Sequence, residues 1–202
     1  MDQQLSLGGE SLLKLARQSP LPQFVYSAAR VEQKLQQLHQ VLKGTGLPYR
    51  IYYAMKANRF APLLTFMRTT GLVGIDVCSP NEISHALGCG FESGDLSFTA
   101  ASLSERDLTQ ILAYDDLAIN CDSLSMIRRI GELAPGRRIG LRINPAMGIG
   151  YGNNQLLQYS GVKTTKFGIY QEQLREVKTI RCPPSLRGTI WRCSISVAMP
   201  PP

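Results

Sequence analysis

Short apolar runs, each ending in a polar residue, recur along the central part of the chain. They span residues 49–55, 72–77, 95–99, 117–121 and 138–143. Their polar ends follow one another at intervals of about 20 to 22 residues. Short apolar runs of this length, bounded by polar residues, are typical of buried strands. The regular interval indicates one structural unit repeated along the chain.

The intervals between these runs carry helical patterns. We expect helices over residues 62–70, 80–87, 104–113 and 123–133. Ser79 is placed to cap the second helix, and Glu82 follows three residues later in a capping-box pattern. Ser104 is placed to cap the third helix in the same way. Strands that alternate with helices of about ten residues predict βαβ units, a parallel sheet and right-handed crossovers.

The polar strand ends favour one α/β fold over another. Polar residues at the carboxyl ends of successive parallel strands are typical of a (β/α)8 barrel, whose chemistry lies at that face. A doubly wound sheet gives the same alternation, but its G-x-G-x-x-G fingerprint does not follow the first run. We interpret Gly148–Gly152 as a loop rather than a phosphate cradle. A complete barrel needs about 250 residues, so the 202 residues predict an incomplete TIM-type barrel of five to six βα units.

Composition narrows the class of protein. Hydrophobic residues make up 44% of the chain, as in a globular domain, and no apolar run is long enough to span a bilayer. The net charge of +7 is scattered and forms no basic patch interleaved with aromatic residues. The five cysteines show no C-x-x-C spacing, and the first residues lack the pattern of a signal peptide. We therefore expect a cytoplasmic protein with no bound metal, nucleic acid or membrane.

The composition changes near Arg181. Residues 181–202 hold five of the twelve prolines and the single tryptophan. We expect an N-terminal segment over residues 1–27, a barrel part over 28–180 and an atypical tail over 181–202. The tail is expected to be disordered or to derive from a shifted reading frame or wrong splicing, and a naturally divergent tail is the alternative. A poorly placed sixth strand is expected over Thr189–Ile195.

Lys56 closes the first apolar run and is the first candidate for chemistry. Side chains alternate along a strand, so Lys56 shares a face with Tyr52 and Ala54. If that face points inward, the small Ala54 leaves room beside the amine for a flat cofactor. A lysine in a partly desolvated site can act as a nucleophile and form a Schiff base. An ordinary surface lysine is the alternative interpretation.

Five segments resemble, in order, the motifs of the fold type III pyridoxal-phosphate-dependent decarboxylases. This family includes the decarboxylases of diaminopimelate, ornithine and arginine, and the resemblance is closest to the diaminopimelate group. It covers residues 21–178 and includes a leading strand followed by a helix over residues 28–42. The matching segments are Gln23–Tyr26, Tyr53–Asn58, Gly74–Ile83, Arg142–Pro145 and Thr165–Ile169.

The resemblance implies a set of site residues in an alanine-racemase-like barrel. Lys56 would be the Schiff-base partner of pyridoxal 5'-phosphate. Asp76 and Glu82 would lie near the cofactor, and Arg142 would reach toward its ring hydroxyl. The alternatives are a turn carboxylate at a strand end for Asp76 and a surface salt bridge for Arg142, since charged groups of both kinds occur in folded proteins.

The resemblance also implies a function, namely decarboxylation of a basic or diamino amino acid by a homodimer. The histidine of the family's sixth-strand H-x-G-S motif has no counterpart in Gly188–Cys193. The family's phosphate loop and C-terminal β-domain also have no counterpart, so we expect impaired activity and stability. Two alternatives stay open: an amino-acid racemase or small cofactor-carrying barrel with the same lysine, and a non-catalytic fragment that binds the cofactor.

Overall fold

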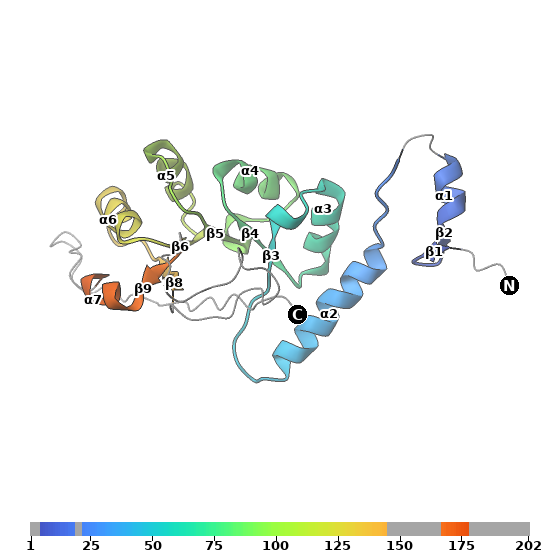
Figure 1. The fold of residues 1–202 in the computed structure, drawn as a ribbon, viewed down its shortest axis with the longest axis horizontal. Helices are drawn as coiled ribbons and strands as arrows, with labels where there is room; N and C mark the ends of the chain where they lie inside the picture. The colour runs from blue at the N-terminus through green and yellow to red at the C-terminus, as the bar shows by residue number, and fades with distance from the viewer. Residues whose placement is uncertain (1–4, 19–21, 145–166, 178–202) are drawn as a thin grey trace, which may run out of the picture.

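A five-stranded parallel sheet forms the centre of the computed structural model, which describes residues 5–18, 22–144 and 167–177 (Figure 1). The strands lie in the order β3-β4-β5-β6-β7, which is their order in the sequence. β4 therefore lies inside the sheet, and the order does not reverse around it. This confirms the predicted barrel-type sheet over a doubly wound one. The strands are β3 (Tyr52–Ala54), β4 (Gly74–Val77), β5 (Leu96–Thr99), β6 (Ala118–Cys121) and β7 (Gly140–Leu141).

Helices that connect these strands lie together on one side of the sheet (Figure 1). Ser79, Ser104 and Ser123 each accept a backbone hydrogen bond at a helix start, as the N-cap patterns predicted. The observed bounds agree with the predicted ones to within about one residue. The helices are α3 (Ala61–Thr70), α4 (Pro80–Gly88), α5 (Glu105–Leu112) and α6 (Leu124–Leu133).

The two faces of the sheet differ in chemistry. Apolar side chains on the helix-covered face are buried, and each contributes about 1.5–3 kcal/mol on burial. They include Ile75, Val77, Leu96, Phe98, Ile119 and Cys121. The other face, which would line a barrel, carries small or polar residues in alternate positions. Those positions hold Ala54, Gly74, Asp76, Ser97, Thr99, Asn120 and Gly140.

The run predicted over residues 138–143 is divided around Arg142. β7 ends at Leu141, and β8 (Ile143–Asn144) pairs in parallel with β9 (Ile169–Tyr170). The sequence pattern did not predict β9, because a strand of two residues is too short to show alternation. Two short helices follow, η3 (Gln171–Gln173) and α7 (Leu174–Val177). The Gly148–Gly152 loop, the Thr189–Ile195 strand and the tail lie outside the described residues.

The N-terminal segment differs from the prediction. It contains a hairpin of β1 (Ser6–Leu7) and β2 (Glu10–Ser11) and then α1 (Leu12–Gln18). The segment is followed by α2 (Ala28–Lys43), which corresponds to the helix predicted over residues 28–42. The predicted leading strand over Gln23–Tyr26 is not formed, although the helix that follows it is. A strand needs a partner for its backbone groups, and no described strand pairs with these residues. Phe24 is 90% exposed, whereas the Tyr26 ring stacks on Phe60 with centroids 5.4 Å apart.

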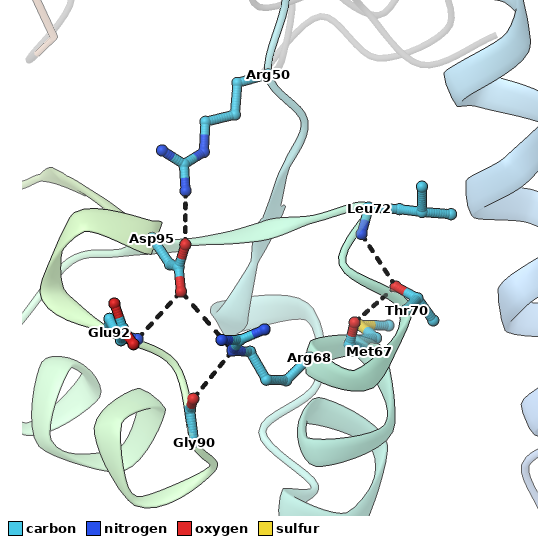
Figure 2. A network of polar contacts seen from close by, with 8 residues as sticks. All are labelled: Arg50, Met67, Arg68, Thr70, Leu72, Gly90, Glu92 and Asp95. Carbon is cyan, nitrogen blue, oxygen red and sulfur yellow. Dashed lines mark hydrogen bonds and ion pairs between the residues drawn. The ribbon is translucent and has the colours of Figure 1, made fainter.

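A polar network joins elements at the amino edge of the sheet (Figure 2). Asp95, at the end of η2 (Ser93–Asp95), receives Arg50 Nη2 on Oδ1 at 2.8 Å and faces Arg68 Nε with Oδ2 at 3.8 Å. Its Oδ2 also accepts the backbone N–H of Glu92, while Arg68 Nε donates to the carbonyl oxygen of Gly90 at 3.0 Å. Partly exposed ion pairs contribute at most about 1 kcal/mol each. The network ties the entry to β3, helix α3 and the entry to β5 at this edge.

Within the described ranges, none of the helices combines the length and apolar character needed to cross a bilayer. Among the same residues, no group of three or more histidine, cysteine or acidic side chains is arranged to hold a metal ion.

Candidate active site

Lys56 lies immediately after β3, in the one-turn helix η1 (Met55–Ala57). The prediction of a partly desolvated lysine is wrong for this structure, because its side chain is exposed. The strand stops at Ala54 and the chain turns, so Lys56 does not continue the strand alternation. Met55 is fully buried in the hydrophobic core and so anchors the turn. The amine therefore stands at the carboxyl edge of the sheet, where solutes can reach it.

The loop that follows Lys56 is held from two sides. Asn58 Nδ2 donates to the Tyr26 hydroxyl at 3.0 Å, and Asn58 Oδ1 accepts the backbone N–H of Phe60 at 2.9 Å. From α4, His85 Nε2 donates to the carbonyl oxygen of Arg59 at 2.8 Å. These bonds restrict the backbone on the C-terminal side of Lys56. They make the asparagine of the Tyr53–Asn58 motif a structural support for the lysine turn.

Glu82 links this loop to the end of β4. Its side chain is 7% exposed, and Oε1 faces Arg59 Nη2 at 3.3 Å. Oε2 accepts the backbone N–H of Cys78 at 2.8 Å and the Cys78 thiol at 3.3 Å. The predicted capping box is thus only half correct: Ser79 caps Glu82, but the glutamate bonds to Cys78 instead of returning to Ser79. A buried carboxylate with several partners is a rigid support.

Asp76 brings the predicted residues into one electrostatic group. It lies on the inner face of β4, between Ala54 of β3 and Ser97 of β5 in the register. Burial raises the pKa of its carboxyl, Lys56 and Arg142 lower that pKa, and Glu82 raises it. Lys56, Glu82 and Arg142, the other three residues that the sequence singled out, therefore each lie within electrostatic range of Asp76.

Arg142 occupies the break between β7 and β8. Its backbone N–H donates to the carbonyl oxygen of Cys121, and its own carbonyl accepts the N–H of Ile169, both at 2.8 Å. Its guanidinium carbon lies 4.4 Å from the centroid of the Phe167 ring, a cation–π contact. Within the described residues Arg142 forms no salt bridge, so the alternative interpretation as a surface ion pair finds no support there.

Three further polar residues of the carboxyl edge were not among the predicted site residues. Cys78 is exposed as a whole residue, but partial desolvation of its thiol and the hydrogen bond to Glu82 raise the pKa of that thiol. Asn120 Nδ2 donates to Ser97 Oγ and Thr99 Oγ1, both at 3.0 Å. Asp122 is 7% exposed. In the sequence, only their positions at strand ends pointed to these residues. Such a position does not distinguish a residue that stabilises the fold from one that binds a ligand.

Two cavities among the described residues lie away from this group. One of about 570 Å³ lies between the N-terminal hairpin and α2, lined by residues such as Gly8, Ser27 and Arg30. The other, of about 330 Å³, lies at the amino edge beside Arg50 and Asp95. Neither touches Lys56. We place the site by its chemistry instead, because the exposed amine and its charged neighbours stand on an open edge of the sheet.

The pKa shift at Asp76 predicts how stability depends on pH. The folded protein holds the Asp76 proton more tightly than the unfolded chain does, so the charged carboxylate destabilises the fold above the raised pKa. The destabilisation disappears as the pH falls below the ordinary value for an aspartate. Asp76→Asn should therefore raise the melting temperature at neutral pH, and the gain should shrink in acid.

Thermal unfolding of both proteins between about pH 4 and 7 checks this expectation, since the ordinary pKa of an aspartate is about 3.9. Asp116→Asn is the control, because Asp116 is exposed and forms no salt bridge among the described residues. A variant that is less stable than the parent at neutral pH would show that Asp76 makes favourable contacts that outweigh its burial.

The group can capture a carbonyl compound that carries acidic groups. Lys56 supplies an exposed primary amine, Asp76 a carboxylate and Arg142 a cation, beside the small Ala54. These residues fit the aldehyde and ring of pyridoxal phosphate, the cofactor implied by the sequence motifs. Residues that would bind its phosphate are not identified among the described ones.

Comparison with known proteins gives a consistent result. Residues 28–183 match the pyridoxal-binding domain of the pyridoxal-dependent decarboxylases. Diaminopimelate decarboxylase of Methanothermobacter thermautotrophicus is 30% identical over 174 residues, which are 86% of this chain and 40% of that protein. The Escherichia coli enzyme is 30% identical over 172 residues, 83% of this chain and 38% of its own length. The chain therefore spans about two fifths of the length of these relatives.

Solved structures give the same picture. Helicobacter pylori diaminopimelate decarboxylase in complex with L-lysine superposes with a TM-score of 0.65 at 27% identity. The superposition covers 81% of this chain and 41% of that one. A lysine decarboxylase from Selenomonas ruminantium, at 22% identity and a TM-score of 0.68, shares the fold.

Proposed function

The chain belongs to the pyridoxal-dependent decarboxylase family, through its pyridoxal-binding domain, and on this premise we propose that it binds pyridoxal 5'-phosphate at Lys56 and serves the decarboxylation of a diamino acid. The observation that carries the proposal is the exposed amine of Lys56 in a supported turn, within electrostatic range of Asp76. An amine at a strand end with fixed charged neighbours is suited to covalent capture of an aldehyde.

Each residue of the group has a proposed role. Lys56 holds the cofactor covalently and, once displaced by the substrate amine, moves a proton at the substrate's α carbon. When bound, pyridoxal phosphate supplies a sink for the electron pair left behind when CO₂ departs. Arg142 supplies positive charge for an acidic group of the cofactor, and Asp76 supplies the opposing negative charge. Glu82 fixes the end of β4 and the Arg59 loop, and so supports the site without touching the reacting atoms.

The substrate class is proposed from the relatives. The two curated relatives described above are diaminopimelate decarboxylases, and the Helicobacter pylori enzyme was solved with L-lysine. Both names indicate a substrate or product with a second amino group on its side chain. We extend this class, a diamino acid that loses its α-carboxyl group, to the present chain. The homodimer and the cytoplasmic location are proposals of the same kind, which rest on the sequence motifs and on the scattered cysteines.

Release of CO₂ from a panel of amino acids tests the proposed reaction. With the cofactor saturating, we expect release from meso-diaminopimelate, lysine or ornithine to exceed release from arginine or an aliphatic amino acid. The activity should be lost in Lys56→Ala, since the amine is the proposed attachment point. Racemisation of an amino acid without CO₂ release would support the racemase alternative. Cofactor binding at Lys56 with neither reaction would support the non-catalytic alternative.

A further inference from the structure

Asp122 is a buried carboxylate at the carboxyl end of β6, and the roles described above do not use it. It is 7% exposed and is followed by Ser123, the N-cap of α6. Charged side chains are seldom buried without a compensating partner. We therefore expect a charged or polar group nearby that compensates the charge of Asp122.

The strand register brings Asp122 beside Arg142. Asn120 pairs with Gly140 and Cys121 with Leu141, so the next pair along the two strands is Asp122 and Arg142. The Arg142 N–H bond to the carbonyl oxygen of Cys121, at 2.8 Å, continues the ladder to this level. The two residues therefore lie side by side immediately after the carboxyl ends of β6 and β7.

The electrostatics agree with this placement. Burial raises the pKa of the Asp122 carboxyl, while Arg142 is the largest influence that lowers it. Hydrogen bonds from its own backbone and from the Ser123 side chain also lower that pKa. The charges of Asp122 and Arg142 thus act on each other without a salt bridge within 4.0 Å among the described residues.

We propose that Asp122 is a positioning residue for Arg142. Its fixed negative charge at the end of β6, together with the Phe167 ring 4.4 Å from the guanidinium carbon, holds the Arg142 side chain at the carboxyl edge of the sheet. There Arg142 lies within electrostatic range of Asp76. The inference rests on the proposed function only for what Arg142 would bind. The orientation of the Arg142 side chain is a property of the protein without cofactor and can be measured there.

The first test needs no cofactor. Nuclear magnetic resonance of the Arg142 side-chain Nε–H group reports how strongly the guanidinium is held. We expect Asp122→Asn, which removes the charge and keeps the shape, to lower the order parameter of this group below about 0.6, the flexible range. Asp116→Asn is the matched control, because Asp116 is exposed near the amino end of the same strand. It should leave the Arg142 order parameter unchanged.

An unchanged Arg142 order parameter in folded Asp122→Asn would overturn the inference and leave Asp122 as a support for the turn before α6. If Asp122→Asn does not fold, Asp122→Ser is measured in the same way, because its smaller side chain adds no bulk and keeps a hydroxyl. The same two outcomes then decide the inference.

A double-mutant cycle on cofactor binding supplies the second test. Asp122→Asn should weaken binding of pyridoxal phosphate by about tenfold, a typical size for coupled neighbours. In an Arg142→Gln background the same change should have almost no effect, because its target is gone. Effects that multiply would show that Asp122 acts independently of Arg142 and overturn the inference. Failure of the parent protein to bind the cofactor at Lys56 would instead contradict the proposed function, and the resonance test would still decide the role of Asp122.

Discussion

Replacing Lys56 by alanine should abolish covalent capture of pyridoxal phosphate by this chain. The amine of Lys56 is exposed on a supported turn and lies within electrostatic range of Asp76, whereas other lysines lack these neighbours among the described residues. Borohydride reduction of the parent protein with added cofactor, followed by peptide mapping, should place the pyridoxyl group on Lys56. In Lys56→Ala the label should fall to the level found on ordinary surface lysines.

Two matched variants sharpen the test. Lys43→Ala removes an exposed lysine at the end of α2 and should leave the labelling of Lys56 intact. Lys56→Arg keeps the positive charge but removes the primary amine, so it should behave like the alanine variant. Label spread evenly over surface lysines in the parent, and unaltered in Lys56→Ala, would contradict both the site and the proposed function.

Gly74→Ala should destabilise the fold by about 3 kcal/mol or more, a large part of the 5–15 kcal/mol typical of a domain. A Cβ at this position would lie 2.2 Å from the backbone carbonyl oxygen of Asp95 and 3.0 Å from two carbons of the Tyr52 ring. The carbonyl oxygen is part of the backbone that leads into β5, so it cannot move aside without shifting that strand. Urea unfolding monitored by circular dichroism measures the change.

The control is another glycine in regular structure. Gly131 lies in α6, and a Cβ there would meet no atom within 4 Å. Gly131→Ala should therefore stabilise the fold by about 0.5–1 kcal/mol through the higher helix propensity of alanine. Equal effects at the two positions would show that contact between β4 and the entry to β5 is not what requires glycine at position 74.

Regular periodicity made most of the fold predictable. The strands from β3 to β7, their parallel order and the helices from α3 to α6 follow from apolar runs at a fixed interval and from serines at helix starts. Elements without such a pattern were missed, as the two-residue β9 and the N-terminal hairpin show. The prediction of a leading strand over residues 23–26 was wrong, because residues that favour strands form one only where another strand pairs with them.

The sequence selected candidate site residues, but it did not predict their contacts. Strand-end position and motif order selected Lys56, Asp76, Glu82 and Arg142 as candidates, and in the structure the other three lie within electrostatic range of Asp76. The exposure of Lys56 was not predictable, because alternation along a strand does not tell where the strand ends. The bond from Cys78 to Glu82 depends on side-chain direction at the start of α4. The contact of Arg142 with Phe167 joins residues 25 positions apart.

Strand order that repeats sequence order allows the sheet to grow while the chain is being synthesised. β3, β4, β5, β6 and β7 begin at residues 52, 74, 96, 118 and 140, so each strand starts 22 residues after the one it joins. At about 5–20 residues per second, a ribosome would deliver a new strand every few seconds. Elementary folding events, such as helix formation and loop closure, take microseconds or less. Each unit of this sheet therefore has time to dock on the preceding one before the next emerges, and no strand has to wait for a distant partner.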